Sequence, residues 1–166
     1  MTREDPVPEI VIDGYTGPRD RLRPLFELAE DSAVELDSYL GMGRILVAQY
    51  RADIVGHLQW VPADRPDTAE IKNMAVLEAL HGKRIGARLV HAALADMAAE
   101  SIRTALVATA TAGIGNLRFY QRQGVRFRSV ERDAFTPAHG YPPGLLVDGI
   151  PLLDRIWLDR PVRLPD

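Results

Sequence analysis

The sequence predicts an α/β (α+β) fold in which helices cover one mixed β-sheet. Two observations predict it. The chain has 166 residues, 46% of them hydrophobic, so residues 1–166 are expected to form one domain with a sizeable core. Strand-like segments come first as a group and then alternate with helical segments. A chain with this order buries a sheet beneath its helices.

The first half of the chain supplies four expected strands and two expected helices. The strand segments are rich in β-forming residues and are bounded by turn residues, and they cover residues 9–13, 44–50, 54–61 and 70–76. Apolar residues recur at helical spacing between Arg19 and Ala29. A second helix is expected over residues 32–40, before Gly41.

The second half of the chain alternates helices and strands. The strongest helix signal covers residues 82–99, because apolar residues there form one stripe. That stripe consists of Ile85, Leu89, Ala93 and Met97. A shorter helix is expected over residues 113–123, ended by Gly124. Three more strands are expected over residues 104–109, 125–131 and 152–158. The segment 137–151 is rich in Pro and Gly and is expected to be a long irregular loop.

Some side chains in these strands can be assigned a place. Alternation along residues 125–131 places Val125, Phe127 and Ser129 on one face. Trp60 and Trp157 lie in strands and are expected in the core, and His57 is expected to be structural or at the surface.

Composition excludes several classes of protein. The chain contains no cysteine, so disulfide scaffolds, thiol catalysis and thiolate metal sites are excluded. Its four histidines are scattered without metal-ligand spacing, so no metal site is expected. A net charge of −3 argues against nucleic-acid binding. Neither a membrane span nor a secretory signal is recognisable, so we expect no membrane contact and a cytoplasmic location.

The segment from Met74 to Arg88 is the most informative one. It reads as a strand, a short turn, and the start of a helix that carries Gly82, Gly86 and basic residues. The first amides of a helix are unpaired and lie at the positive end of its dipole, and glycines let a phosphate approach the backbone. This pattern predicts an anion site. A surface helix with ordinary basic residues is the alternative.

The segment His81-Gly82-Lys83-Arg84-Ile85-Gly86 resembles motif A of the Gcn5-related N-acetyltransferase (GNAT) superfamily, Gln/Arg-x-x-Gly-x-Gly/Ala. It departs from that pattern at His81 and at Arg84, which stands where the family has its first glycine. A later family motif, Phe-Tyr-x-x-x-Gly-Phe, is similar to residues 119–125. The resemblance covers roughly residues 9–158, and residues 68–158 look most like a group of small bacterial acetyltransferases.

The resemblance implies a GNAT fold. Its central sheet is mixed and mostly antiparallel, with about six to seven strands splayed between the fourth and fifth and about four flanking helices. It also implies acetyl-CoA as the cofactor, without a metal. Pantetheine would pair with the strand around a bulge at Met74-Ala75-Val76, and pyrophosphate would lie on residues 81–87, which include Ala87.

The implied reaction is direct attack of an amine on a thioester in a ternary complex. The resemblance makes Tyr120 the candidate general acid for the departing thiolate, with core packing beside Phe119 as the alternative. Asn116, one helical turn earlier, is a candidate for binding pantetheine or else a surface residue.

Glu70 is the candidate general base, acting through water. It precedes Met74 by four residues, so strand alternation puts both on one face unless a bulge intervenes. The alternative is an exposed glutamate paired with Lys72.

Two distinctive segments are expected to wall the acceptor site. The first is an acidic stretch in the first two helices, where Glu27, Glu30 and Asp31 are candidate acceptor ligands or else a solvated helix face. The second is the loop 133–151, whose candidates are Phe135, His139 and Tyr141. A long loop argues against the open groove that a peptide needs.

Three functions therefore remain open. The first is acetylation of a primary amine on a small molecule, such as a cationic antibiotic of the aminoglycoside type. The second is acetylation of a protein or peptide, and the third is non-catalytic binding of acetyl-CoA. A homodimer is compatible with all three.

Overall fold

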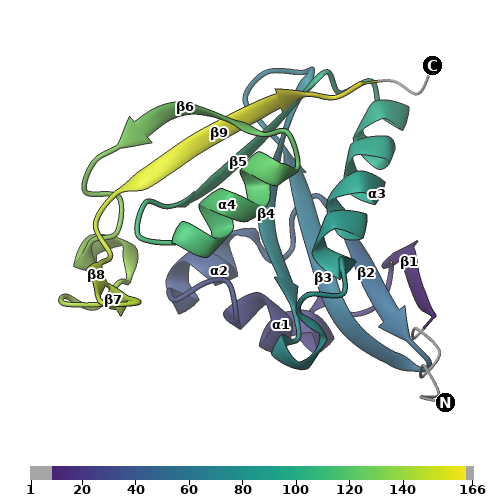
Figure 1. The fold of residues 1–166 in the computed structure, drawn as a ribbon, viewed down its shortest axis with the longest axis horizontal. Helices are drawn as coiled ribbons and strands as arrows, with labels where there is room; N and C mark the ends of the chain where they lie inside the picture. The colour runs from purple at the N-terminus through teal and green to yellow at the C-terminus, as the bar shows by residue number, and fades with distance from the viewer. Residues whose placement is uncertain (1–8, 164–166) are drawn as a thin grey trace, which may run out of the picture.

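The computed structural model describes residues 9–163 and contains a seven-stranded sheet in the order β1-β2-β3-β4-β5-β9-β6 (Figure 1). Its strands are β1 (Ile10–Gly14), β2 (Arg44–Tyr50), β3 (Asp53–Pro62), β4 (Thr68–Val76), β5 (Thr104–Ala110), β6 (Arg126–Glu131) and β9 (Arg155–Pro161). Every pair of neighbours is antiparallel except β4 and β5, which are parallel. The predicted mixed, mostly antiparallel sheet is confirmed.

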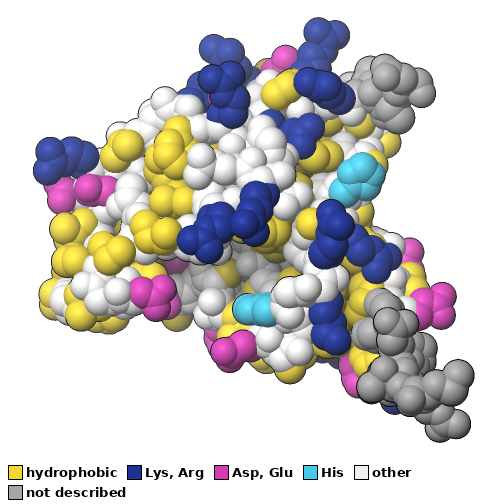
Figure 2. Space-filling view, in the orientation of Figure 1, with side chains coloured by type: hydrophobic (Ala, Val, Ile, Leu, Met, Phe, Trp, Pro, Cys, Tyr) yellow, Lys and Arg dark blue, Asp and Glu magenta, His cyan; other side chains and the backbone are white. Residues whose placement is uncertain are grey.

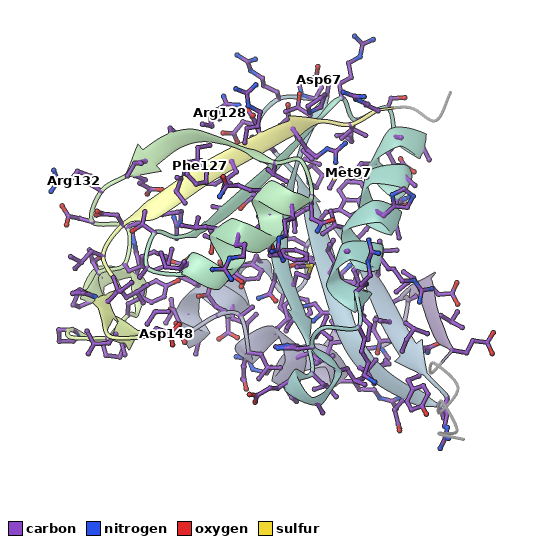
Figure 3. The ribbon with its side chains drawn as sticks, in the orientation of Figure 1. Asp67, Met97, Phe127, Arg128, Arg132 and Asp148 are labelled. Atoms are coloured by element: carbon purple, nitrogen blue, oxygen red, sulfur yellow. The ribbon has the colours of Figure 1, made fainter. Side chains whose placement is uncertain are left out.

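Helices cover both faces of this sheet (Figure 1). The helical elements are η1 (Arg19–Leu22), α1 (Arg23–Glu27), α2 (Ala33–Tyr39), η2 (Glu78–Leu80), α3 (Ile85–Ala99) and α4 (Ile114–Arg122). One core cluster lies between the sheet and α3, with side chains of α4, and includes the fully buried Met97 (Figure 3). A second, smaller cluster packs η1, α1 and α2 against Ile45 and Val47 of β2. None of the helices in residues 9–163 has the length and hydropathy needed to cross a membrane.

The sheet opens between β4 and β5. These two strands pair only where Thr68–Ile71 lies beside Thr104–Val107. Beyond that point β4 continues to Val76 along β3, while β5 continues to Ala110 along β9, and the two diverge (Figure 1). The predicted splay between the fourth and fifth strands is therefore present, and the edge of β4 after Ile71 faces an opening.

A register shift in β4 sets which way its side chains point. Ile71 pairs with Trp60 but Asn73 pairs with the preceding residue of β3, so Lys72 is an extra residue in the ladder. Ile71 and Met74 both belong to the α3 side of the sheet, and Asn73 donates to the carbonyl of Phe26 on the α1 side. The bulge thus precedes the expected Met74-Ala75-Val76 segment, and it reverses the alternation of side chains.

Several boundaries differ from the sequence prediction. The helix expected from residue 82 begins at Ile85, because Gly82 and Arg84 have left-handed φ angles of 78° and 63°. The last strand starts at Arg155, three residues later than expected. The expected loop 137–151 contains η3 (Pro137–His139) and the short strands β7 (Leu146–Val147) and β8 (Ile150–Pro151).

The hairpin of β7 and β8 could have been predicted from its turn sequence. Its turn residues Asp148 and Gly149 both have positive φ, 49° and 81°, as an Asp-Gly pair favours between short apolar segments. Asp148 marks the tip of this hairpin in Figure 3.

The strand β6 lies at the edge of the sheet and is exposed throughout. Its register shifts between Phe127 and Ser129, so the shared face expected for Val125, Phe127 and Ser129 is wrong. Val125 is buried, whereas Phe127 is 54% exposed beside Arg128 at the sheet edge (Figure 3). Twist and pairing at an edge are set by the neighbouring strand β9, which local alternation does not show.

Candidate active site

A cleft of about 1290 Å³ follows the opening between β4 and β5. Its walls come from the ends of β4 and β5, the start of α3, the first turns of α4, the α1–α2 connection, the segment around η3, and β9. The surface is hollowed beneath α4, and Lys and Arg side chains gather over α4 and the start of α3 (Figure 2). This volume exceeds that of a typical small-ligand pocket and suits an extended cofactor together with a second molecule.

The start of α3 has the backbone features expected of an anion site, and residues 81–87 are called the cradle below. Arg88 is the first residue whose amide is bonded in the helical pattern, to the carbonyl of Arg84. Among residues 9–163, no backbone carbonyl accepts from the amides of residues 82–87, so these N–H groups are free for a ligand. The left-handed conformation of Gly82 and Arg84 keeps these residues out of the helix, and left-handed turns of this kind can form anion-binding concavities.

The pattern that this segment resembles has a glycine where this chain has Arg84. A φ of 63° suits glycine and strains other residues. Gly86 is small for a different reason, since a Cβ there would lie 3.3 Å from the ring of Phe119. Arg84 therefore adopts the left-handed backbone conformation that a glycine would adopt at this position.

Most of the predicted cofactor residues of this segment line the cleft, namely His81, Gly82, Arg84, Ile85, Gly86 and Ala87. Lys83 does not line it. Arg88 donates to the carbonyl of Ile10 at 2.7 Å and so ties α3 to β1. His81 Nε2 lies 2.7 Å from the carbonyl of Val76 and joins the cradle to the end of β4.

The middle of the cleft is shaped for an extended chain. Met74, Ala75 and Val76 line it from β4, where the strand has no neighbour on the β5 side. Opposite them, Asn116 lines the cleft from α4, and its Nδ2 lies 3.4 Å from the Oγ1 of Thr109 on β5. Residues of β4 thus offer free backbone groups to a ligand that adds alongside it.

The structure places Tyr120 in the core and Phe119 on the cleft wall. Tyr120 is 7% exposed, its ring packs edge-on against Phe119, and it is not among the residues that line the cleft. Burial raises the pKa of its hydroxyl, so the phenol stays protonated over the whole neutral range. The ring of Tyr120 thus packs beside Phe119 as the alternative expected, and the acid role of its hydroxyl stays a prediction.

Glu70 lies on the opposite side of the sheet from Met74. Because of the bulge at Lys72 the two do not share a face, although both line the cleft as it passes through the splay. The Glu70 carboxylate is 3.7 Å from Lys72 Nζ, and its side chain is 16% exposed. Burial raises the pKa of Glu70, while Lys72 and Arg155 oppose that shift. A carboxylate with a raised pKa is better matched to accept a proton near neutrality.

The acidic stretch splits into two groups. Glu30 and Asp31 line the cleft, whereas Glu27 does not and pairs with Arg23 at 3.0 Å. Phe135 and Tyr141 line the cleft from the other wall. His139 does not line it, and its backbone carbonyl accepts a hydrogen bond from the Oγ of Ser32.

Further residues line this half of the cleft without having been predicted to belong to it, among them Tyr39, Lys72, Arg155 and Trp157. Trp157 was expected in the core, but it lines the cleft and donates to Glu131 at 3.1 Å. Lys72 Nζ faces the ring of Tyr39 at 5.0 Å, and Arg155 faces the ring of Phe135 at 5.1 Å. Only the placement of α2 and β9 beside β4 and β5 brings these side chains together.

Free amides at a helix start, a splayed strand edge and a largely buried carboxylate lie along one cleft, as expected for the class of enzymes that take an acyl group from a coenzyme A thioester. The sequence model of the Acetyltransferase (GNAT) family matches residues 15–125. The chain belongs to this family. The predicted family and the enzyme class, an acyltransferase, are confirmed.

Individual relatives agree with this assignment. The chain is 31% identical over 142 residues to the uncharacterized N-acetyltransferase YvbK of Bacillus subtilis (strain 168), covering 84% of this chain and 90% of that protein. An IAA acetyltransferase from Bacillus cereus ATCC 14579 superposes with a TM-score of 0.83 at 28% identity, over 92% of this chain and 99% of that one.

A GNAT family acetyltransferase from Elizabethkingia anophelis, solved with acetyl-CoA bound, gives a TM-score of 0.83 at 28% identity, over 92% of this chain and 97% of that one. Together with the family assignment, this relative confirms the predicted cofactor.

Proposed function

We propose that the protein transfers an acetyl group from acetyl-CoA to a primary amine of a small molecule. The proposal is supported by the cleft, which combines a cradle for phosphates, a free strand edge for pantetheine and a separate compartment around Glu70. Bound acetyl-CoA would supply an activated carbonyl carbon. The amine nitrogen would attack that carbon, the carbon–sulfur bond would break, and CoA would leave as the thiol.

The chain's own residues would hold the reactants and move two protons. The amides of residues 82–87 would bind pyrophosphate, and the backbone near Met74 and Ala75 would hold the acetyl oxygen. Glu70 would accept the amine proton through water, aided by the raised pKa that burial gives it. Tyr120 remains the proposed donor to the departing sulfur. Positioning by backbone groups dominates such a site, so single side-chain changes should slow it without abolishing it.

One observation favours a small molecule over a peptide. The loop around η3 is fastened to the α1–α2 connection across the acceptor half of the cleft. Ser32 Oγ donates to the carbonyl of His139 at 2.7 Å, and Tyr141 donates to Glu30 at 2.7 Å. Ser32 and Tyr141 are both buried. A peptide chain needs an open groove, whereas here these bonds join two segments that wall the cleft.

The charges of the acceptor half narrow the choice of amine. A cationic acceptor would be attracted by the carboxylates of Glu30, Asp31 and Glu70. Aminoglycosides carry such cationic amines and therefore belong to the small-molecule amines proposed as acceptors. Lys72 and Arg155 share the same compartment, and Glu27 is absent from it. A smaller amine with one or two cationic groups therefore suits the site better than a polycation.

The test is CoA thiol release from acetyl-CoA with a panel of polyamines, aminoglycosides, amino acids and short peptides. We expect at least one small amine to raise thiol release well above hydrolysis and peptides to remain near background. No acceleration by any amine, combined with tight acetyl-CoA binding, would favour the non-catalytic alternative. Preference for a peptide would replace the small-molecule proposal.

We also propose a cytoplasmic location, where acetyl-CoA is available, and a homodimer. The exposed apolar side chains Ile114, Phe127 and Val130, on α4 and the edge strand β6, support a contact between copies. Sedimentation of the wild-type protein and of a Phe127→Glu variant measures this directly, and a monomeric wild type would rule the dimer out.

A further inference from the structure

Glu30 is held in the cleft by two tyrosines. It lies in the connection between α1 and α2, and each of its carboxylate oxygens accepts one hydrogen bond. Tyr141 donates to Oε2 at 2.7 Å, and Tyr39 donates to Oε1 at 3.2 Å. The two donors come from segments far apart in the sequence, so the carboxylate position is set by the tertiary fold.

The tyrosines themselves are fixed. Tyr39 and Tyr141 are 4% and 3% exposed. The Tyr39 hydroxyl also accepts from Asn73 Nδ2 at 3.0 Å, and Asn73 Oδ1 accepts from His57 Nε2 at 2.8 Å in the core. A chain of hydrogen bonds therefore runs from the fully buried His57 to a carboxylate on the cleft wall. A carboxylate fixed in this way loses little conformational entropy when it binds a ligand.

The carboxylate of Glu30 is bound by neutral donors. Two other carboxylates in or beside the cleft form ion pairs, Glu70 with Lys72 and Glu131 with Arg155. Within the described part of the chain, residues 9–163, no ion pair to Glu30 is formed. Burial, together with the nearby Glu30 charge, raises the pKa of both tyrosine hydroxyls, so they remain neutral donors. A half-buried carboxylate held by neutral donors keeps its negative charge available for a charge-assisted hydrogen bond with a cationic ligand.

We propose that Glu30 binds a second, positively charged group of the acceptor, and that the enzyme therefore prefers diamines to monoamines. One amine of such a molecule reacts in neutral form, and the other forms an ion pair with Glu30 as an ammonium. Tyr39 and Tyr141 are positioning residues for this contact. The inference rests on the proposed function, because it assigns a role to the compartment in which the acceptor binds.

The experiment measures binding and turnover separately. Cadaverine and pentylamine, which differ by one terminal amine, are titrated by calorimetry into the CoA-saturated protein. Wild type, Glu30→Gln, Tyr141→Phe and the matched control Glu27→Gln are compared, since Glu27 is a neighbouring acid outside the cleft. We expect wild type and Glu27→Gln to bind the diamine about 10- to 100-fold more tightly than the monoamine. That preference should disappear in Glu30→Gln and shrink in Tyr141→Phe.

Equal binding of the two amines by wild type would overturn the proposal, as would a preference that survives in Glu30→Gln. A purely structural role of Glu30 would weaken both amines alike, which this comparison separates from a specific one. Thiol release with the same amines tests the proposed function on its own. A binding preference without thiol release would support the Glu30 site and refute acetyl transfer to these acceptors.

Discussion

Acid destabilisation should depend strongly on His57. Its imidazole is fully buried, stacks on Phe26 with the ring centroids 4.1 Å apart, and donates from Nε2 to Asn73. Its Nδ1 has no hydrogen-bond partner among the described residues. A second proton would therefore be buried without a partner. Burial lowers the pKa of His57 from 6.5 to about 4, although the bond to Asn73 opposes this shift.

The sign and size of the effect follow from linkage. The folded pKa is depressed, so the unfolded chain takes up the proton first as the pH falls. The contribution of neutral His57 is complete above the unfolded pKa of 6.5, and it is lost as the pH falls toward the folded pKa of about 4. A shift of this size corresponds to roughly 3 kcal/mol in total, of which roughly 2 kcal/mol is lost between about pH 7.5 and pH 5.

Urea unfolding of wild type and of His57→Gln over this pH range measures the effect, and the glutamine retains an N–H donor for Asn73. We expect the free energy of unfolding of wild type to fall by about 2 kcal/mol more than that of the variant. A proton NMR titration of the wild-type imidazole gives a check that does not depend on the variant folding. Parallel pH curves, or an imidazole that titrates near its ordinary pKa, would refute the reasoning.

Three other predictions concern the cleft. Arg84→Gly removes the strain of a left-handed non-glycine residue, which costs about 1–2 kcal/mol of stability. Part of this gain is offset, because glycine gives the unfolded chain more conformational freedom. Thermal unfolding should show a gain of up to about 1 kcal/mol that Arg84→Ala lacks, and equal stability of the two variants would contradict the strain. Tyr120→Phe should lower kcat by about 100-fold if the hydroxyl protonates sulfur, whereas an unchanged kcat would leave Tyr120 as a core residue only. Wild-type activity should fall as the pH drops through the raised pKa of Glu70. If the pH–activity profile of Glu70→Gln shows the same fall at low pH, Glu70 is excluded as the base.

Local sequence located most of the helices and strands and the segment proposed to bind the cofactor. The apolar stripe of α3 and the turn at Gly124 depend on neighbours a few residues apart, so periodicity located both elements. The anion cradle is likewise one continuous segment, and its motif could be recognised despite His81 and Arg84. What the motif did not show was that Arg84 adopts the left-handed conformation of the glycine it replaces.

The acceptor half was predicted less completely, because its residues come from separate segments. Glu30 and Glu27 look alike in an acidic helical stretch, yet one accepts from Tyr141 in the cleft and the other pairs with Arg23 outside it. The bulge at Lys72 shifts the strand register and separates the faces of Glu70 and Met74.

The sequence by itself therefore determined the family, the cofactor and the cradle, because short-range backbone geometry encodes them. Only the tertiary structure decided which acidic, tyrosine and basic side chains meet in the part of the cleft proposed to bind the acceptor. That arrangement depends on how the α1–α2 connection, the η3 segment and β9 pack around the splayed strands, and no local pattern records such packing.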